Sequence, residues 1–114
     1  MDSNQFAYRV TPDLKEKGHE LLNTEHAGIQ SIVLHKFDGN KAHLFALHEQ
    51  DVFPTHATPR HAMIQVVDGR AIVELGEDEI EAVSNTWIYM PPSLPHRIQA
   101  QTAFIFVLHV QPVN

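Results

Sequence analysis

Cysteine is absent from this chain of 114 residues, and so are long apolar runs. Without cysteine there can be no disulfide, no thiolate nucleophile and no cysteine-bound zinc. No stretch approaches the ~20 consecutive apolar residues that a membrane-spanning helix needs, so we expect no membrane partner. Residues 1–10 include Asp2 and lack the apolar segment of a secretory signal, so we expect a cytoplasmic protein.

Positive charge is also scarce. Eight Lys and Arg residues stand against 14 Asp and Glu residues, which gives a formal net charge of −6. Because a nucleic-acid-binding surface needs a basic patch, we expect no nucleic-acid partner. Histidine, by contrast, is abundant, with nine residues. Imidazole is the commonest metal ligand in proteins and titrates near neutral pH, so the histidines are the first place to look for chemistry.

From Gly28 onward the sequence consists of short apolar segments separated by turn residues, which predicts an all-β sandwich or barrel. The clearest predicted hairpin joins residues 63–67 to residues 70–75 through Asp68-Gly69, because Asp-Gly between two apolar runs is typical of a type I′ turn. Asp38-Gly39 indicates another turn. The other expected strands are residues 29–35, 41–48, 80–83, 86–90 and 103–110.

A short helix is predicted before the strands. Thr11 could cap its N-terminus, Pro12 suits the first helical position, and Asp13 complements the positive end of the helix dipole. Gly18 would weaken such a helix. We therefore divide the chain into an N-terminal arm, residues 1–27, and a barrel domain, residues 28–114.

Two segments carry the histidines of most interest, and both follow a recognisable pattern. Residues 56–69 run from His56 to Gly69, and residues 85–96 include Pro91 and end at His96. In these segments the sequence resembles the cupin superfamily of small jelly-roll barrels (double-stranded β-helices, RmlC-like). The family patterns are H-x-H-x3-E-x6-G and G-x5-P-x-G-x2-H-x3-N. The resemblance covers about three-quarters of the chain and implies that His56 and His96 are metal ligands.

Several positions depart from the family pattern. Thr58 stands at the second histidine of the first motif, Ala62 at its glutamate, and Ala100 at the final asparagine of the second motif. At Thr58 and Ala62, two of the four metal ligands that the family usually has are therefore missing. Because catalytic metal sites generally use three protein ligands, a third histidine would be needed.

His61 is the first candidate for that third ligand. Successive strand residues face opposite sides, so a strand that places Ala62 inside would place His61 outside, unless Pro59 and Arg60 reset the alternation with a bend or bulge. His48 and His109, at the ends of apolar strands, are the other candidates. The remaining four histidines are interpreted as surface residues, namely His19, His26, His35 and His43.

The resemblance implies a small-molecule ligand at the barrel mouth, and two classes of function stay open. One is a metal-dependent, dioxygenase-like enzyme using iron, nickel, manganese or zinc held by His56, His96 and His61. The other is a metal-free ligand-binding or sensing barrel in which His56 and His96 form hydrogen bonds. A metal-free isomerase with Tyr89 as its acid is a variant of the second class. The sequence identifies no catalytic residue.

We also expect a homodimer. The predicted strand 103–110 is apolar on both faces, so it is either buried on both sides or part of a subunit interface. Small cupins commonly pair through sheet augmentation, and residues 5–10 could supply a strand for that contact. The acidic residues 74–81 are interpreted as a solvated hairpin tip rather than a catalytic carboxylate pair.

Overall fold

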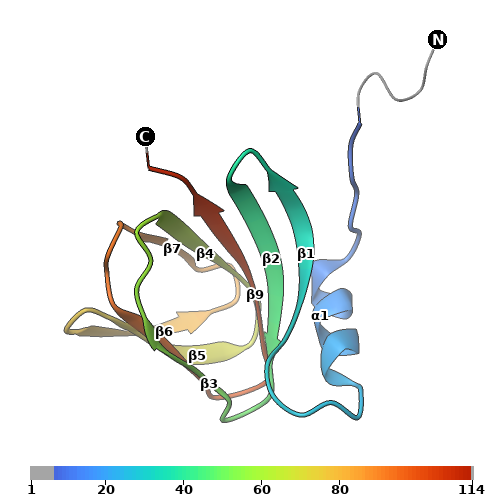
Figure 1. Cartoon of the computed structure of the whole chain (residues 1–114). Helices are drawn as coiled ribbons and strands as arrows, with labels where there is room; N and C mark the ends of the chain where they lie inside the picture. Colours follow the sequence, from blue (N-terminus) through green and yellow to red (C-terminus); the bar gives the residue numbers. More distant parts are fainter. Residues whose placement is uncertain (1–6, 114) are drawn as a thin grey trace.

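Strands dominate the part of the chain that the structure describes, residues 7–113 of a computed structural model (Figure 1). The elements in chain order are α1 (Leu14–Leu22), β1 (Gln30–Phe37), β2 (Asn40–Leu47), β3 (Val52–His56), β4 (His61–Asp68), β5 (Arg70–Leu75), β6 (Asp78–Val83), β7 (Trp87–Met90), β8 (His96–Ala100) and β9 (Phe104–Gln111). The prediction of an all-β fold with a short N-terminal helix is confirmed.

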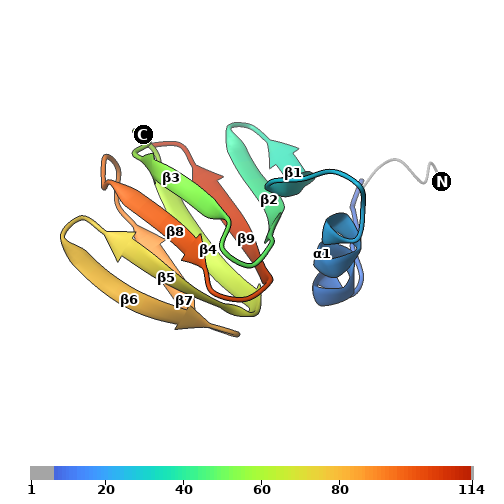
Figure 2. The same ribbon diagram turned by 90° about the horizontal axis from the view of Figure 1, so that it is seen from below.

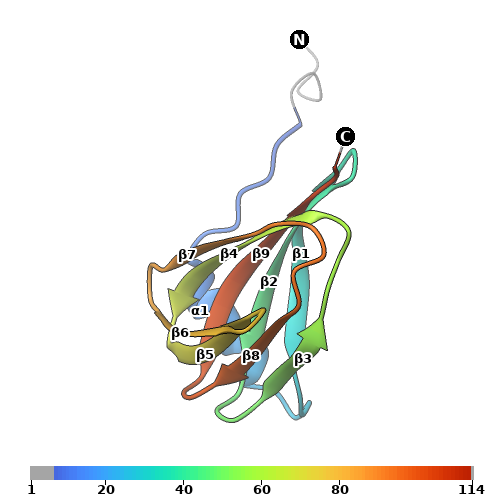
Figure 3. The same cartoon turned by 90° about the vertical axis from the view of Figure 1, so that its left-hand side faces the viewer.

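The strands form two antiparallel sheets that face each other (Figures 2 and 3). The larger sheet has the order β1-β2-β9-β4-β7, and the smaller one has the order β3-β8-β5-β6. Every second residue of a strand points between the sheets, which is why β4 alternates buried and less buried residues from Ala62 to Val66. The apolar core lies between the two sheets.

Strand β9 is buried on both of its faces. Phe104 and Phe106 point into the core between the sheets, whereas Ile105 and Val107 point outward into a second apolar cluster. That second cluster includes leucines of α1, which packs on the outside of the larger sheet (Figure 2). The prediction of a strand buried on both sides is confirmed, and the helix supplies the cover on the outer face.

The helix begins later than predicted. Its N-cap is Asp13, not Thr11, because the Asp13 carboxylate accepts a hydrogen bond from the Glu16 amide at 3.0 Å. Gly18 does not interrupt the helix; it lies where α1 presses against Ile105, and a methyl group at this position would collide with that side chain. Glycine therefore allows the helix to approach the sheet closely.

The predicted hairpin at Asp68-Gly69 is wrong. Strands β4 and β5 belong to different sheets, and the chain crosses between them at these residues. The β4 register shifts between Val66 and Asp68, and Gly69 has φ = 95° and approaches the Ala103 carbonyl too closely for any side chain. Asp-Gly sequences allow positive φ values. Here this conformation turns the chain from one sheet into the other instead of forming a two-residue hairpin turn.

The turn at Asp38-Gly39 is confirmed, since both residues have positive φ values and join the paired strands β1 and β2.

The segment before α1 differs from expectation. Residues 7–10 form no strand, and residues 5 and 6 of the predicted dimer-forming strand lie outside the described part of the chain. No helix within residues 7–113 has the length and apolar character needed to cross a membrane.

Candidate functional site

His56 and His96 are brought together by two strands that the sequence did not predict. His56 is the last residue of β3, His96 is the first residue of β8, and the two are direct partners in the antiparallel register. Proline in the β3 sequence and the Pro-rich segment before β8 masked both strands. The cupin-like motifs, which place both histidines, nevertheless identified the pair.

The two imidazole rings are in contact. Their centroids lie 4.1 Å apart with an interplanar angle of 62°. His96 is only 3% exposed and is the only buried polar or charged residue among residues 7–113, whereas His56 is exposed. The pair therefore spans from the barrel interior to the solvent.

Aromatic side chains extend the site inward from His56. The Phe53 ring lies 5.0 Å from the His56 ring, and Phe45 lies 5.3 Å from both Phe53 and Phe106. These phenylalanines lie outside the two histidine motifs, so the motifs did not identify them as part of the site. The positions of Phe45 and Phe106 could have been predicted from strand alternation. Each points to the face of its strand that lies between the sheets, and its neighbours in the sequence point to the other face.

Each imidazole of the pair is held by a backbone carbonyl two residues earlier in the chain. His56 Nδ1 lies 3.0 Å from the Pro54 oxygen, and His96 Nδ1 lies 3.1 Å from the Leu94 oxygen. A carbonyl oxygen only accepts hydrogen bonds, so each Nδ1 carries a proton and donates it. In the neutral rings both Nε2 atoms then keep a lone pair available to a ligand.

Burial favours the neutral form of His96. Removal of its ring from water lowers the pKa of His96, the hydrogen bond to Leu94 opposes this, and the neighbouring His56 lowers the pKa further. The lone pair on His96 Nε2 is therefore present at neutral pH.

The positions that replace the usual metal ligands offer little to a metal ion. Ala62, at the position of the usual glutamate, is 2% exposed and belongs to the apolar core, as does Ala100 at the position of the motif's final asparagine. The Thr58 hydroxyl accepts a hydrogen bond from the Arg60 amide at 3.3 Å. Within residues 7–113, no three His, Asp or Glu side chains gather in a way that could hold a metal ion.

His61 lies on the outside of the larger sheet, as strand alternation predicts. Its neighbour Ala62 points into the core, and His61 Nδ1 lies 2.7 Å from the hydroxyl of Tyr89. The structure therefore does not bring His61 to His56 and His96. Tyr89 also faces outward, since Ile88 and Met90 occupy the core, so the suggestion of Tyr89 as an acid inside the barrel is wrong.

Four of the other histidines occupy three kinds of environment. His48 contacts the Asp51 carboxylate at 3.3 Å and the Leu22 carbonyl at 3.2 Å, and so links β2 to the end of α1. His109 lies on the outer face of β9, its ring 5.8 Å from that of Trp87. Neither joins the pair. His26 and His35 are exposed, as predicted.

Two of the four histidines interpreted as surface residues are engaged instead. His43 shares the inward face of β2 with Phe45, at 5.9 Å between ring centroids, and its pKa is lowered first by burial and then by Lys41 and Lys36. His19 Nε2 lies 2.7 Å from the Asp68 carboxylate and ties α1 to the end of β4. Alternation along β2 was the available signal for His43.

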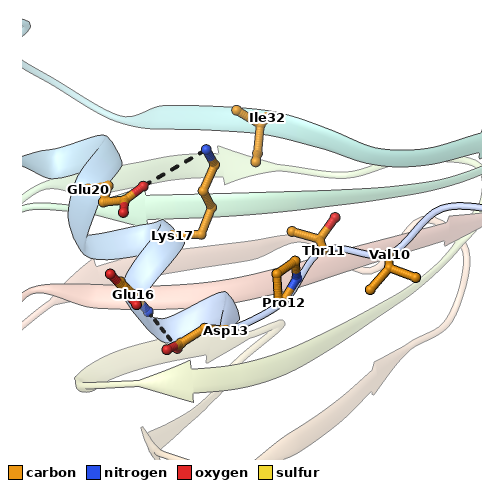
Figure 4. Close-up of a pocket in the computed structure, with 8 residues that line it drawn as sticks. All are labelled: Val10, Thr11, Pro12, Asp13, Glu16, Lys17, Glu20 and Ile32. Carbon is orange, nitrogen blue, oxygen red and sulfur yellow. Dashed lines mark hydrogen bonds and ion pairs between the residues drawn. The ribbon is translucent and has the colours of Figure 1, made fainter.

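A groove of about 570 Å³ lies away from the histidine pair, between α1, the segment before it and Ile32 of β1 (Figure 4). Some of its polar groups are engaged with one another. The Asp13 carboxylate accepts from the Glu16 amide, and the Lys17 ammonium lies 3.9 Å from the Glu20 carboxylate.

Comparison with known proteins agrees with this architecture. The sequence pattern of the AraC-like ligand binding domain matches residues 40–112, which is more than half of the chain and includes both histidines of the pair. The chain belongs to this family. The AraC-like ligand binding domain is a cupin family, so the predicted membership of the cupin superfamily is confirmed. No curated protein matches the chain.

Solved structures share the fold at low sequence identity. A conserved protein of unknown function from Streptococcus pyogenes is 22% identical, with a TM-score of 0.79 over 97% of this chain and 94% of that one. A cupin superfamily protein from Desulfitobacterium hafniense is 15% identical, with a TM-score of 0.72 over 79% and 84%. Salicylate 1,2-dioxygenase from Pseudoaminobacter salicylatoxidans is 15% identical, with a TM-score of 0.73 over 84% of this chain and 31% of the enzyme. These likenesses confirm the double-stranded β-helix fold.

Proposed function

We propose that this AraC-like domain binds a small molecule at the His56–His96 end of its barrel, without a resident metal ion. The observation that carries the proposal is the pair of Nδ1 hydrogen bonds to the Pro54 and Leu94 carbonyls, which leaves two Nε2 acceptors on adjacent rings. Two adjacent acceptors fit a ligand with two hydrogen-bond donors, such as hydroxyl, amide or amino groups. The family match agrees with a binding role.

The surroundings of the pair support a ligand with an apolar side. Phe53 lies against His56, and Phe45 and Phe106 continue the aromatic lining inward. Small-molecule sites in proteins are mostly apolar with a few polar groups that fix orientation. In this proposal the phenylalanines contact the body of the ligand and the imidazoles orient its donors.

A metal-dependent, dioxygenase-like enzyme is the second candidate. It is favoured by the same two Nε2 lone pairs, since imidazole suits iron, nickel and zinc, and a fixed Nδ1–H is the usual arrangement behind a metal-bound histidine. The donor set opposes it, because Ala62 carries no donor atom at the position of the usual glutamate and His61 points outward. We therefore derive no catalytic step through a metal.

The ligand proposal can be tested by NMR on ¹⁵N-labelled protein. We expect both His56 and His96 to show the Nδ1–H tautomer. In a panel of polyols, amides, amines and carboxylates, compounds with paired donors should shift the ring nitrogens of His56 and His96. A His96→Gln variant should lose these shifts, whereas His61→Gln, the matched control on the outer face, should keep them. Nε2–H tautomers at both residues would overturn the proposal.

Metal analysis separates the two candidates. Protein without a tag is dialysed against Zn²⁺, Ni²⁺, Mn²⁺ or Fe²⁺ and its metal content is measured. We expect substoichiometric metal in the wild type. One tightly held ion per chain that is lost in both His56→Ala and His96→Ala, but retained in His61→Ala, would instead favour the metal-dependent enzyme.

A further inference from the structure

Two lysines face each other on the inner side of the larger sheet. Lys36 of β1 and Lys41 of β2 are direct partners in the antiparallel register. Lys41 shares the inward face of β2 with His43 and Phe45, because side chains alternate along a strand. Like charges directly opposite each other destabilise a sheet, so the fold itself gains nothing from this lysine pair.

A bulge in β1 turns Lys36 to this inner face. Leu34 points outward into the apolar cluster beneath α1, so unbroken alternation would point Lys36 outward as well. The register shifts between Val33 and His35, and this shift sets Lys36 opposite the inward Lys41. Bulges re-aim side chains in this way and are frequent next to functional sites.

Among residues 7–113, no acidic side chain forms an ion pair with either ammonium group. Asp38, in the turn between β1 and β2, is exposed and does not contact them. The row of residues that contains Lys36 and Lys41 continues across the sheet through the apolar Val110 and Ala62. The two lysines therefore make a local positive region in a chain whose net charge is −6.

The usual role of lysine at a sheet edge does not account for this pair. Lysine on an edge strand discourages pairing with other chains, and β1 is such a strand. Lys41, however, lies on β2, which is paired on both sides, with β1 and with β9. Its charge is directed into the space between the sheets, where it has no edge to protect.

The lysines lie at the same end of the barrel as the histidine pair. Strand β3 follows β2 after residues 48–51 and returns toward the end where β2 begins. The Phe53 ring lies 5.0 Å from the His56 ring and 5.3 Å from Phe45. Phe45 in turn lies 5.9 Å from His43, and Lys41 is two residues, ~7 Å, beyond His43 on the same face.

Two further observations connect the lysines to this end of the barrel. Arg60, in the link from β3 to β4, donates a hydrogen bond at 3.1 Å to the carbonyl of Gly39, in the turn between the lysine strands (Figure 3). After burial, the charges of Lys41 and Lys36 lower the pKa of His43. Their positive field therefore reaches the inner face between the lysines and the aromatic rings.

We propose that the ligand of this barrel is an anion whose carboxylate binds between Lys36 and Lys41. The inference rests on the proposed function, since the donors of the same ligand reach His56 and His96. Hydrogen bonds from ammonium groups to a carboxylate are about twice as strong as neutral ones. Lys36 is exposed and Lys41 is half-buried, so a ligand can reach both. The ligand class is therefore hydroxy- or amino-carboxylates with an apolar body, rather than neutral polyols or amides.

A matched acid and amide test this inference. Protocatechuate combines two adjacent hydroxyl donors, an apolar ring and a carboxylate, and its carboxamide is the neutral counterpart. NMR titration follows the ring nitrogens of His56 and His96 with each compound. We expect the acid to bind about tenfold more tightly than the amide, or more, because it gains charge-assisted hydrogen bonds. Added salt should weaken binding of the acid only.

Variants assign this preference to the lysines. Lys41→Gln should weaken binding of the acid about tenfold and leave binding of the amide unchanged. Lys41→Arg keeps the charge and should retain the preference for the acid. Lys17→Gln is the matched control, because it removes an equal charge from α1, outside the larger sheet. It should bind both compounds as the wild type does, and circular dichroism should confirm that every variant is folded.

The outcomes separate this inference from the proposed function. Equal affinities for the acid and the amide, with shifts at His56 and His96, would overturn the anionic ligand and leave the ligand site in place. A preference for the acid that survives Lys41→Gln and Lys36→Gln together would also overturn it. Ring nitrogens that respond to neither compound at millimolar concentration would count against the ligand site itself, and the inference would fall with it.

Discussion

The barrel carries two histidine–aromatic clusters, one inside and one outside, and they differ in how their imidazole nitrogens are engaged. Inside, the Nδ1 atoms of His56 and His96 both donate to backbone carbonyls and leave two Nε2 acceptors free. Outside, His61 shares its Nδ1 with Tyr89, and His109 has a buried Nε2 atom with no partner among the described residues. Similar residues in the two clusters therefore leave different ring nitrogens without a hydrogen-bond partner.

The first prediction concerns stability and should show the largest difference between the clusters. Phe106 is fully buried beneath the inner pair, so Phe106→Ala should lower the free energy of unfolding by about 3–5 kcal/mol. Tyr89→Ala on the outer face should cost less than about 1 kcal/mol, because the Tyr89 side chain is 51% exposed. Urea denaturation of both variants measures the two losses in the free energy of unfolding. Equal losses would mean that the outer ring is as well packed as the inner one.

The second prediction concerns pH. Burial lowers the pKa of His96 in the folded protein. As the pH falls, the His96 ring is therefore protonated more readily in the unfolded chain than in the folded chain. Stability should therefore fall as the pH decreases below about 6.5, by an amount on the order of 1 kcal/mol. His96→Gln should reduce the slope of this dependence between pH 7.5 and pH 5.5, as measured by chemical denaturation, while His43 and His109, whose pKa values are also lowered by burial, maintain the remainder. His61→Gln should retain the wild-type slope; if it flattened the slope instead, the assignment of the proton to His96 would fail.

The third prediction concerns the contact between His19 and the Asp68 carboxylate, where we expect the smallest change in stability. The hydrogen bond from His19, and then the charge of Lys15, lower the pKa of Asp68, which ties α1 to β4. Because the pKa is lowered in the folded state, the ionised Asp68 carboxylate stabilises the folded protein at pH values above the ordinary pKa of Asp, about 3.8. This stabilisation is lost as the pH falls below that value.

Asp68→Asn should accordingly cost about 0.5–1 kcal/mol at pH 7 and close to nothing at pH 2–3. Thermal unfolding at the two pH values measures the difference. A penalty that stays the same in acid would indicate that the carboxylate charge does not stabilise the helix contact.

Local sequence predicted much of the fold because hydrophobic segments and turn residues act over short distances. The strands β1, β2, β5 and β9 and the turn at Asp38-Gly39 follow from such signals. The corner at Asp68-Gly69 does not, because a hairpin and a crossing between sheets use the same residues with positive φ. Only the pairing of distant strands decides between them.

The site was predictable to the extent that motifs and alternation determine it. The motifs identified His56 and His96, and alternation predicted that His61 faces outward. The tautomers of the pair were not predictable, since they depend on the distance of each ring from the Pro54 and Leu94 carbonyls. The inward position of His43 follows from the same alternation along β2, but adjacent polar residues obscured it.

The position of β9 has a consequence for how the protein acquires its structure. This strand follows all the others in the chain, yet it lies in the middle of the larger sheet, between β2 and β4. Until β9 is available, β1 and β2 can form only an isolated hairpin, and β4 and β7 another strand pair, neither of which is stable by itself in water. We therefore expect the larger sheet to assemble in one late cooperative step, at the slow rate typical of folds rich in long-range contacts.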